Sequence, residues 1–340
     1  MIHLRIVAPR ANCSHVLELL DDTDTVVNVA YFKDAVMKPP ADLILCDVAT
    51  RDVSLLVADL RELNVDREGS ISIDEIDAEI GMTSTDLHRR RRDDIGAADP
   101  VVWENVARRT SDSVELSHSF LIFMALAMQI AAVGIYFNQP ILIVGAMVVG
   151  PDFGPIAGVC VALVQRDIGL ARRSMRALVV GILIGVVLCF FTTLLLQWAG
   201  ALPDNINFDQ HTLTRFISNP DFFSVYVAVA AGIIGVLSLT TSKSSVLVGV
   251  LISVTTIPAA ANIGVAAAYH DGATAWGATA QLLVNLTSIF VAGFLTLYIQ
   301  RRRYLRRRRA HLNSPSRRDA GLPIGKSRRD GDKGYEPSVH

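Results

Sequence analysis

Residues 145–158 read GAMVVGPDFGPIAG and lie inside an apolar run, 139–164, that is long enough to cross a bilayer. The stretch contains an aspartate, Asp152, between two prolines, Pro151 and Pro155. Hydrocarbon strongly disfavours a carboxylate, and a proline removes one hydrogen bond from a helix. We therefore expect a membrane-spanning helix that is broken near its middle, with Asp152 beside the break.

Five more apolar runs lie between Ser117 and the arginine-rich end of the chain. Each is long enough for a hydrocarbon core of roughly 30 Å. Together with the first run they predict six membrane spans, at 117–137, 139–164, 174–198, 222–240, 244–268 and 274–299. The sequence therefore predicts an α-helical multi-pass membrane domain at 117–300.

Basic residues between the runs set the predicted orientation. The loop 165–176 carries four arginines, and the segment RRRYLRRRR at 301–309 follows the last run. Basic residues near the ends of spans stay in the cytoplasm, so both termini are predicted to be cytoplasmic. The first residues lack the basic start and continuous apolar core of a signal peptide. We expect a multi-pass protein of a bacterial inner membrane.

The six runs form two halves of three, and each half contains a run interrupted by proline. The stretches 131–158 and 232–264 share a glycine-containing helix end, a short polar link and an apolar helix with proline. The proline of the second stretch is Pro258. Because three is odd, the second half must enter the membrane from the opposite side. The pattern thus predicts a 3+3 inverted repeat with broken helices 2 and 5, a recurrent layout of secondary transporters.

Small residues recur every four positions on both interrupted helices. The glycines among them are Gly150, Gly154 and Gly158 on the second helix and Gly264 on the fifth. Such ladders let helix backbones approach closely. We expect these glycines to pack helices, either within the chain or between copies in a homo-oligomer.

Polar side chains near the interrupted helices are the candidate binding residues. A helix break leaves amides and carbonyls without partners, which protein or a wet cavity must satisfy. Asp152 would then be a fixed charge or proton carrier for a bound ion or solute. The further candidates are amides of the apolar runs, Asn262, Gln129, Gln281 and Asn285. The alternative is structural, because prolines also kink helices and amides also tie helices together.

The first 80 residues differ from the rest in charge and in pattern. Residues 1–116 hold 23 Asp and Glu against 13 Lys and Arg. The spacing of apolar residues predicts the order βαββαβ, with strands at 2–8, 25–32, 42–48 and 69–76 and helices at 13–21 and 52–63. This is the order of a ferredoxin-like domain. We expect a cytoplasmic α+β domain at 1–80 that regulates or assembles the membrane domain, or that is a passive cap.

Two charged segments flank the predicted membrane domain. Residues 81–116 are predicted to be a helical connector that includes an interfacial helix, and 301–340 a basic disordered cytoplasmic tail. The tail arginines either hold anionic membrane lipids or only enforce orientation. A nucleic-acid partner is disfavoured, because the HRRRR run at 88–92 has no interleaved aromatic residues. The four cysteines form no CxxC pair, so neither a metal site nor a cofactor is predicted.

The first interrupted run resembles a known family. Gly145, Ala146, Met147 and Pro151, followed by PIAG at 155–158, are similar to the pattern GAM-x-x-(S/G)-P-x-x-x-P-I plus a small residue and glycine. That pattern belongs to the domain-of-unknown-function 389 family of bacterial membrane proteins. A later block, GVLISVTTIPAAANIG, is also similar, although Ala259 stands where many members have a second proline. The resemblance implies a multi-pass inner-membrane protein with a soluble N-terminal domain and no assigned activity.

The leading functional hypothesis is a transporter or channel-like conduit for a small solute or ion, with its site between the second and fifth helices. The competing hypothesis is a non-transporting membrane sensor or oligomeric scaffold, in which Asp152 is bonded inside a dry interface. An intramembrane enzyme is disfavoured, because the sequence has no HExxH or GxSxG motif and no second intramembrane aspartate. The charge of the substrate stays open, since a carboxylate favours cations and helix N-termini favour anions.

Overall fold

The computed structural model describes residues 1–75, 103, 106, 110, 116–203, 217, 221–240 and 255–327. The chain divides into two compact units, Met1–Glu104 with Gln300–His340, and Asn105–Ile299. The described residues are mostly helical, with a small antiparallel sheet in the first unit. The connector predicted at 81–116 lies almost entirely outside the described residues.

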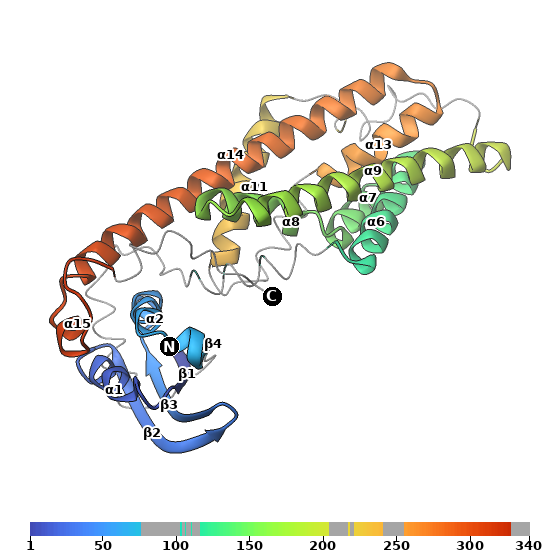
Figure 1. Ribbon diagram of the computed structural model, residues 1–340. Helices are drawn as coiled ribbons and strands as arrows, with labels where there is room; N and C mark the ends of the chain where they lie inside the picture. The colour runs from blue at the N-terminus through green and yellow to red at the C-terminus, as the bar shows by residue number, and fades with distance from the viewer. Residues whose placement is uncertain are drawn as a thin grey trace. The chain divides into compact units, whose positions relative to one another are not determined.

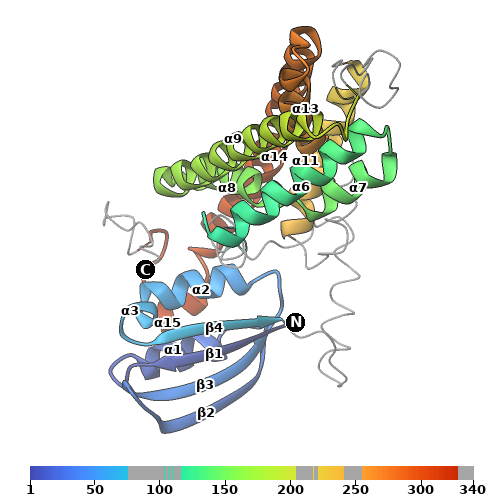
Figure 2. The ribbon, with the colours of Figure 1, turned by 90° about the vertical axis from the view of Figure 1, so that its right-hand side faces the viewer.

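The first unit has the strands and helices that the sequence predicts, with one short helix added. Its elements are β1 (Ile2–Ala8), α1 (Cys13–Asp21), β2 (Val26–Met37), β3 (Pro40–Val48), α2 (Val53–Glu62), α3 (Val65–Glu68) and β4 (Ser70–Glu75). All pairings are antiparallel, in the order β2-β3-β1-β4, and Figure 2 shows the four strands side by side. β2 continues to Met37, past its predicted end, because it pairs with β3 as far as Pro40.

One face of the sheet carries the apolar core of the first unit. Alternate residues of β1 (Ile2, Leu4 and Ile6) are buried on the same side, as the two-residue period of a strand requires. Helices α1 and α2 pack on this core with apolar residues spaced three or four apart, Val16, Leu19, Leu20, Leu56 and Leu60. Ala320 and Leu322, from the other end of the chain, belong to the same core.

The second unit contains the apolar helices. Four described helices are long and apolar enough to cross a membrane, α6 (His118–Tyr136), α9 (Ile168–Trp198), α11 (Phe222–Thr240) and α14 (Gly272–His311). A fifth candidate is the pair α7 (Pro140–Val149) and α8 (Phe153–Gln165), whose axes bend by 48°. The fifth predicted span corresponds to a shorter apolar helix, α13 (Thr256–Ala268), and residues 241–254 before it lie outside the description. The described chain therefore has four or five candidate spans, against six predicted.

Glycines allow close helix contacts in the second unit. A Cβ atom added to Gly264 of α13 would lie 2.5 Å from the carbonyl oxygen of Val186 on α9. A Cβ atom added to Gly232 of α11 would lie 2.8 Å from the carbonyl oxygen of Ile289 on α14. In both pairs a side chain would meet backbone rather than a movable side chain. These helices therefore approach at a separation that only glycine permits.

The C-terminal segment differs from the prediction. Residues 301–340 were expected to form a disordered tail, yet α14 continues as one helix to His311 and a further helix, α15, spans Pro315–Asp319 (Figure 1). The prediction of disorder is wrong for 301–327, and residues 328–340 lie outside the description. The prediction considered only the surface that the segment could bury by itself. In the structure, Ala320 and Leu322 are buried in the core of the first unit, and Arg308 and Arg317 form ion pairs there.

Candidate functional site

The interrupted helix is broken at Gly150, Pro151 and Asp152. Helix α7 ends at Val149, Gly150 has an extended backbone (φ −73°, ψ 131°), and Asp152 is the N-cap residue of α8. A residue that precedes proline is disfavoured in the helical region, so Pro151 ends α7 at this point. Pro155 is the third residue of α8, where a helix needs no amide hydrogen from its own chain. The break is therefore due to Pro151, and Pro155 fits within the first turn of α8.

Helix α13 begins in the same way as α8. Its N-cap residue is Thr255, its third residue is Pro258, and its length is 13 residues, the same as that of α8. Pro258 thus also lies in a first turn rather than in a helix interior. Both short helices therefore begin with a polar N-cap residue and have a proline in their first turn.

The first turns of α8 and α13 meet at Asp152. The hydroxyl of Thr256 donates a hydrogen bond to Oδ2 of Asp152. A side chain at Gly150 would overlap Ile257, so the break itself lies directly against α13. Asp152 is 5% exposed, and no basic side chain among the described residues pairs with it. A buried carboxylate in an apolar helix bundle is thus held by a hydroxyl donor alone among the side chains that the structure describes.

Two amides of α14 extend this contact into a string of polar side chains. Nδ2 of Asn285 donates to Oγ1 of Thr255 at 2.8 Å, and Nε2 of Gln281 donates to Oδ1 of Asn285 at 3.4 Å. Gln281 and Asn285 are 1% and 3% exposed. Oε1 of Gln281 is buried and accepts no hydrogen bond within the described parts of the chain. We call this set the break site; its members are Asp152, Thr255, Thr256, Gln281 and Asn285.

The break site contains three of the five polar residues that the sequence singled out. Asp152, Gln281 and Asn285 come together, whereas the hydrogen bonds of the string do not include Gln129 or Asn262. Gln129 lies half-buried on α6, and Asn262 is fully buried in the second turn of α13. Thr255 and Thr256 were missed. Their position three and two residues before Pro258, which matches Asp152 and Phe153 before Pro155, is the signal that would have found them.

The predicted packing glycines lie in different surroundings. Gly150 and Gly264 sit against neighbouring helices, as their contacts with Ile257 and Val186 show. Gly158 is buried within α8, and Gly154 is half-buried in the first turn of that helix. The described residues contain no group of three or more His, Cys, Asp or Glu side chains that could hold a metal ion.

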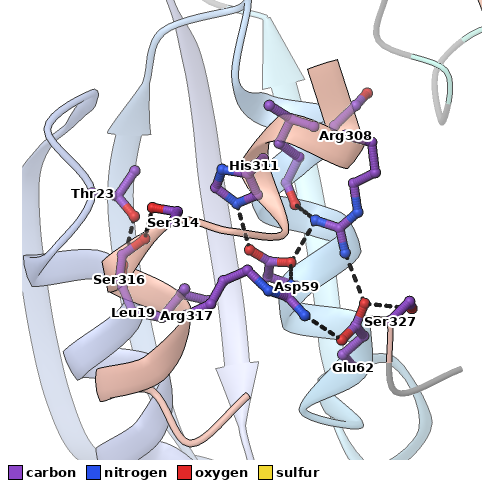
Figure 3. A network of polar contacts seen from close by, with 12 residues as sticks. Leu19, Thr23, Asp59, Glu62, Arg308, His311, Ser314, Ser316, Arg317 and Ser327 are labelled. Atoms are coloured by element: carbon purple, nitrogen blue, oxygen red, sulfur yellow. Dashed lines mark hydrogen bonds and ion pairs between the residues drawn. The ribbon is translucent and has the colours of Figure 1, made fainter. Parts of the chain in front are cut away.

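A second polar cluster lies in the first unit, on helix α2 (Figure 3). Two carboxylates of α2 receive hydrogen bonds and ion pairs from the C-terminal segment; the set, here called the α2 cluster, is Asp59, Glu62, Arg308, His311, Arg317 and Ser327. Glu62 is bridged by Nη2 of Arg308 and Nη2 of Arg317, each at 2.8 Å, and by the Ser327 hydroxyl at 2.6 Å. The sequence did not indicate this cluster, because its partners are about 250 residues apart along the chain.

The α2 cluster keeps a fully buried carboxylate charged. Burial pushes the pKa of Asp59 upward, but the hydrogen bond from His311 and the charges of Arg308 and Arg317 outweigh it. The pKa of Asp59 therefore lies below its usual value. Arg317 has no exposed surface, so its charge is compensated entirely by Asp59 and Glu62. The C-terminal segment is thus fixed on α2 by buried ion pairs.

Acid is expected to loosen the α2 cluster. A carboxylate whose pKa is lowered by folding contributes stability above its unfolded pKa, and this contribution is lost as the pH falls through the lowered value. Hydrogen exchange of the α2 amides, corrected for the intrinsic rate, should show constant protection from pH 7 to about 5 and decreasing protection below about pH 4. Asp59→Asn should make this decrease smaller. A decrease of equal size in the variant would contradict the assignment to Asp59.

Residues 147–291 match the model of a family described as "Domain of unknown function (DUF389)". This segment includes the helix break, α13 and both amides of the break site. The match assigns residues 147–291 to this domain family. An uncharacterized protein of Methanocaldococcus jannaschii, MJ0678, is 26% identical to it over 199 residues, which cover 56% of each chain. The matched part thus spans little more than half the length of this relative, and no solved structure matches the chain.

Proposed function

We propose that this protein is a transporter or channel-like conduit for a small ion or solute, with the break site as its binding site. The observation that carries the proposal is Asp152, a buried carboxylate at a helix break that pairs with no basic side chain among the described residues. Charged groups inside a membrane are costly and are kept mainly on ion or substrate pathways. The hydroxyls of Thr255 and Thr256 and the amide oxygen of Gln281 supply further ligand atoms beside it.

The two short helices support an inverted repeat of three plus three spans. α8 and α13 have equal lengths, polar N-cap residues and a proline at the third position. Helices that begin at mid-membrane in matching positions of two halves are a recurrent feature of secondary transporters. In this proposal α8 and α13 are the half-helices of the two repeats, and the residues between their first turns bind the ligand.

The first unit is proposed to be a ferredoxin-like regulatory or assembly domain in the cytoplasm. The strand order β2-β3-β1-β4, with all pairs antiparallel and helices after β1 and β3, supports this assignment. The arginines at 165–176 and 301–309 support a cytoplasmic location of both termini in a bacterial inner membrane. A homo-oligomer in which copies pack through the small-residue faces belongs to the same proposal.

One observation favours the competing function, a non-transporting sensor or scaffold. The Asp152 carboxylate already accepts a hydrogen bond from Thr256, so it has a structural use in joining α8 to α13. In such a protein the break site would stay closed, and the first unit would pass a signal or bind a partner.

Flux through reconstituted protein separates the two functions. We expect proteoliposomes that contain the full chain to pass one of a panel of probes (protons, sodium, potassium, chloride or phosphate) faster than empty liposomes. Asp152→Asn should lower that flux by about tenfold or more, because the amide keeps the shape but not the charge of the site. Asp167→Asn is the matched control, since Asp167 caps α9 outside the break site, and it should keep the flux.

The same measurement can reject the proposal. Wild-type protein that passes none of the probes would favour the scaffold. A flux that Asp152→Asn leaves unchanged would show that the break site does not bind the permeating species. The melting temperature of each variant in detergent is compared with that of wild type. This comparison distinguishes a folded variant that has lost flux from a variant that no longer folds.

A further inference from the structure

Six of the seven arginines at 301–309 fall into two groups of three on the last turns of α14. Three of them are engaged by the first unit. The guanidinium of Arg301 lies 5.0 Å from the ring centre of Trp103 and 5.1 Å from that of Tyr304. Arg307 pairs with Asp52 at 2.8 Å, and Arg308 pairs with both carboxylates of the α2 cluster. These three cations are already compensated by aromatic faces or carboxylates.

Three other arginines point away from these contacts. Arg303, Arg306 and Arg309 are exposed and have no ion pair or hydrogen bond within the described parts of the chain. A spacing of three residues keeps them on one side of the helix. We call these three residues the arginine stripe. Because Arg301, Arg307 and Arg308 contact other residues of the first unit, the last turns of α14, which carry the stripe, are held in place within that unit.

The stripe follows the apolar part of α14 within the same helix. Ile299 is the last apolar residue before the arginine run. With a rise of 1.5 Å per residue, Arg303 lies about 6 Å and Arg309 about 15 Å farther along the axis. The polar headgroup layer of a bilayer is roughly 5–8 Å thick on each side. Arg303 is therefore at headgroup depth when α14 spans a membrane, and Arg309 is within about one Debye length of that layer.

The geometry points to anionic phospholipid headgroups as the partner of the arginine stripe. A guanidinium binds phosphate oxygens through two parallel hydrogen bonds, and it does so more strongly than a neutral donor. Basic clusters immediately beyond a membrane span are attracted to anionic lipids. The orientation of the spans requires only the positive charges, whereas here three guanidinium groups that pair with no described residue lie on one side of a helix. This inference is independent of whether the break site transports anything.

Lipid retention by the purified full chain tests the proposal. In an uncharged detergent, native mass spectrometry should show that wild type retains phosphatidylglycerol in preference to phosphatidylcholine. The triple variant Arg303→Gln, Arg306→Gln, Arg309→Gln should lose this preference, by about fivefold for each arginine removed. The corresponding triple lysine variant keeps the charges and should retain most of the preference. All three residues are exposed and pair with no described residue, so both variants should melt at the wild-type temperature.

The matched control removes three positive charges from β1, β2 and the turn between β2 and β3 in the first unit. Arg5→Gln, Lys33→Gln, Lys38→Gln changes exposed residues and should leave the preference for phosphatidylglycerol intact. Equal losses in the control and in the stripe variant would overturn the proposal, as would a stripe variant with an unchanged preference. Glycerol phosphate, a soluble headgroup without acyl chains, should not compete at equal concentration. Full competition would assign a site for a soluble anion and overturn the lipid assignment.

Discussion

Arg317→Met is expected to lower the free energy of unfolding of the first unit by about 3–5 kcal/mol. Arg317 is fully buried; one end of its guanidinium pairs with Asp59 and the other with Glu62, the latter at 2.8 Å. Methionine fills similar space but leaves two buried carboxylates to share the charge of Arg308. A buried charge that loses its partner keeps its desolvation cost, and this cost is the source of the expected effect.

Hydrogen exchange of α2 and α15 is the suitable measurement, because a chain with an apolar helical unit does not unfold in one step. Protection of both helices should fall in Arg317→Met, since the C-terminal segment is held on α2 by this residue. Arg318→Met is the control: it changes the neighbouring arginine, which is exposed. Arg317→Lys should give protection between that of the two methionine variants. An ammonium keeps the charge but cannot bridge both carboxylates as a planar guanidinium does. Equal protection in the two methionine variants would contradict the role of Arg317.

The position of the helix break was predictable because it follows from local chemistry. Pro151 disfavours a helical conformation in the residue before it, and this holds whatever surrounds the chain. The pairing of Asp152 with Thr256 was not predictable in the same way. It depends on how α8 and α13 pack, and a threonine in an apolar run gives no signal of its own. The residues that complete the break site were therefore visible only by matching the two halves of the chain.

For the C-terminal segment, local composition led to an incorrect prediction. Its composition, rich in arginine and poor in apolar residues, is typical of disorder when the segment is considered alone. Leu322 and Ala320 nevertheless bury their side chains, because α1, α2 and the sheet provide the rest of the core. Arg317 is fully buried, because its guanidinium forms ion pairs with two carboxylates of α2. The composition of a segment indicates how much apolar surface the segment can bury by itself. It does not indicate contacts with residues that are distant in the sequence. The strands of the first unit were predicted better. Apolar residues alternate with more exposed residues along β1 and β3, and this pattern indicates which face of the sheet is buried by helices.

Gly264→Ala is expected to destabilise the second unit by about 1–3 kcal/mol or more, although alanine is the better helix former. The added Cβ atom would lie 2.5 Å from the Val186 carbonyl oxygen, 2.9 Å from Cβ of Cys189 and 3.1 Å from the backbone nitrogen of Phe190. Two of these three atoms belong to the backbone of α9, so α13 and α9 must separate. Thr255 and Thr256 are the N-cap and first residues of α13. A shift of α13 away from α9 would therefore also strain the contact between Thr256 and Asp152.

Gly145→Ala is the matched control for this substitution. Gly145 lies in α7, and an added Cβ atom there would meet no atom within 4 Å. The control should therefore keep or slightly raise the melting temperature in detergent, since alanine costs less backbone entropy in a helix than glycine. Gly264→Ala should lower it by several degrees. If both variants melt at the same temperature, the close approach of α13 to α9 at Gly264 is not a constraint on the fold. The position would then tolerate a side chain, and the spacing of small residues on α13 would need another explanation.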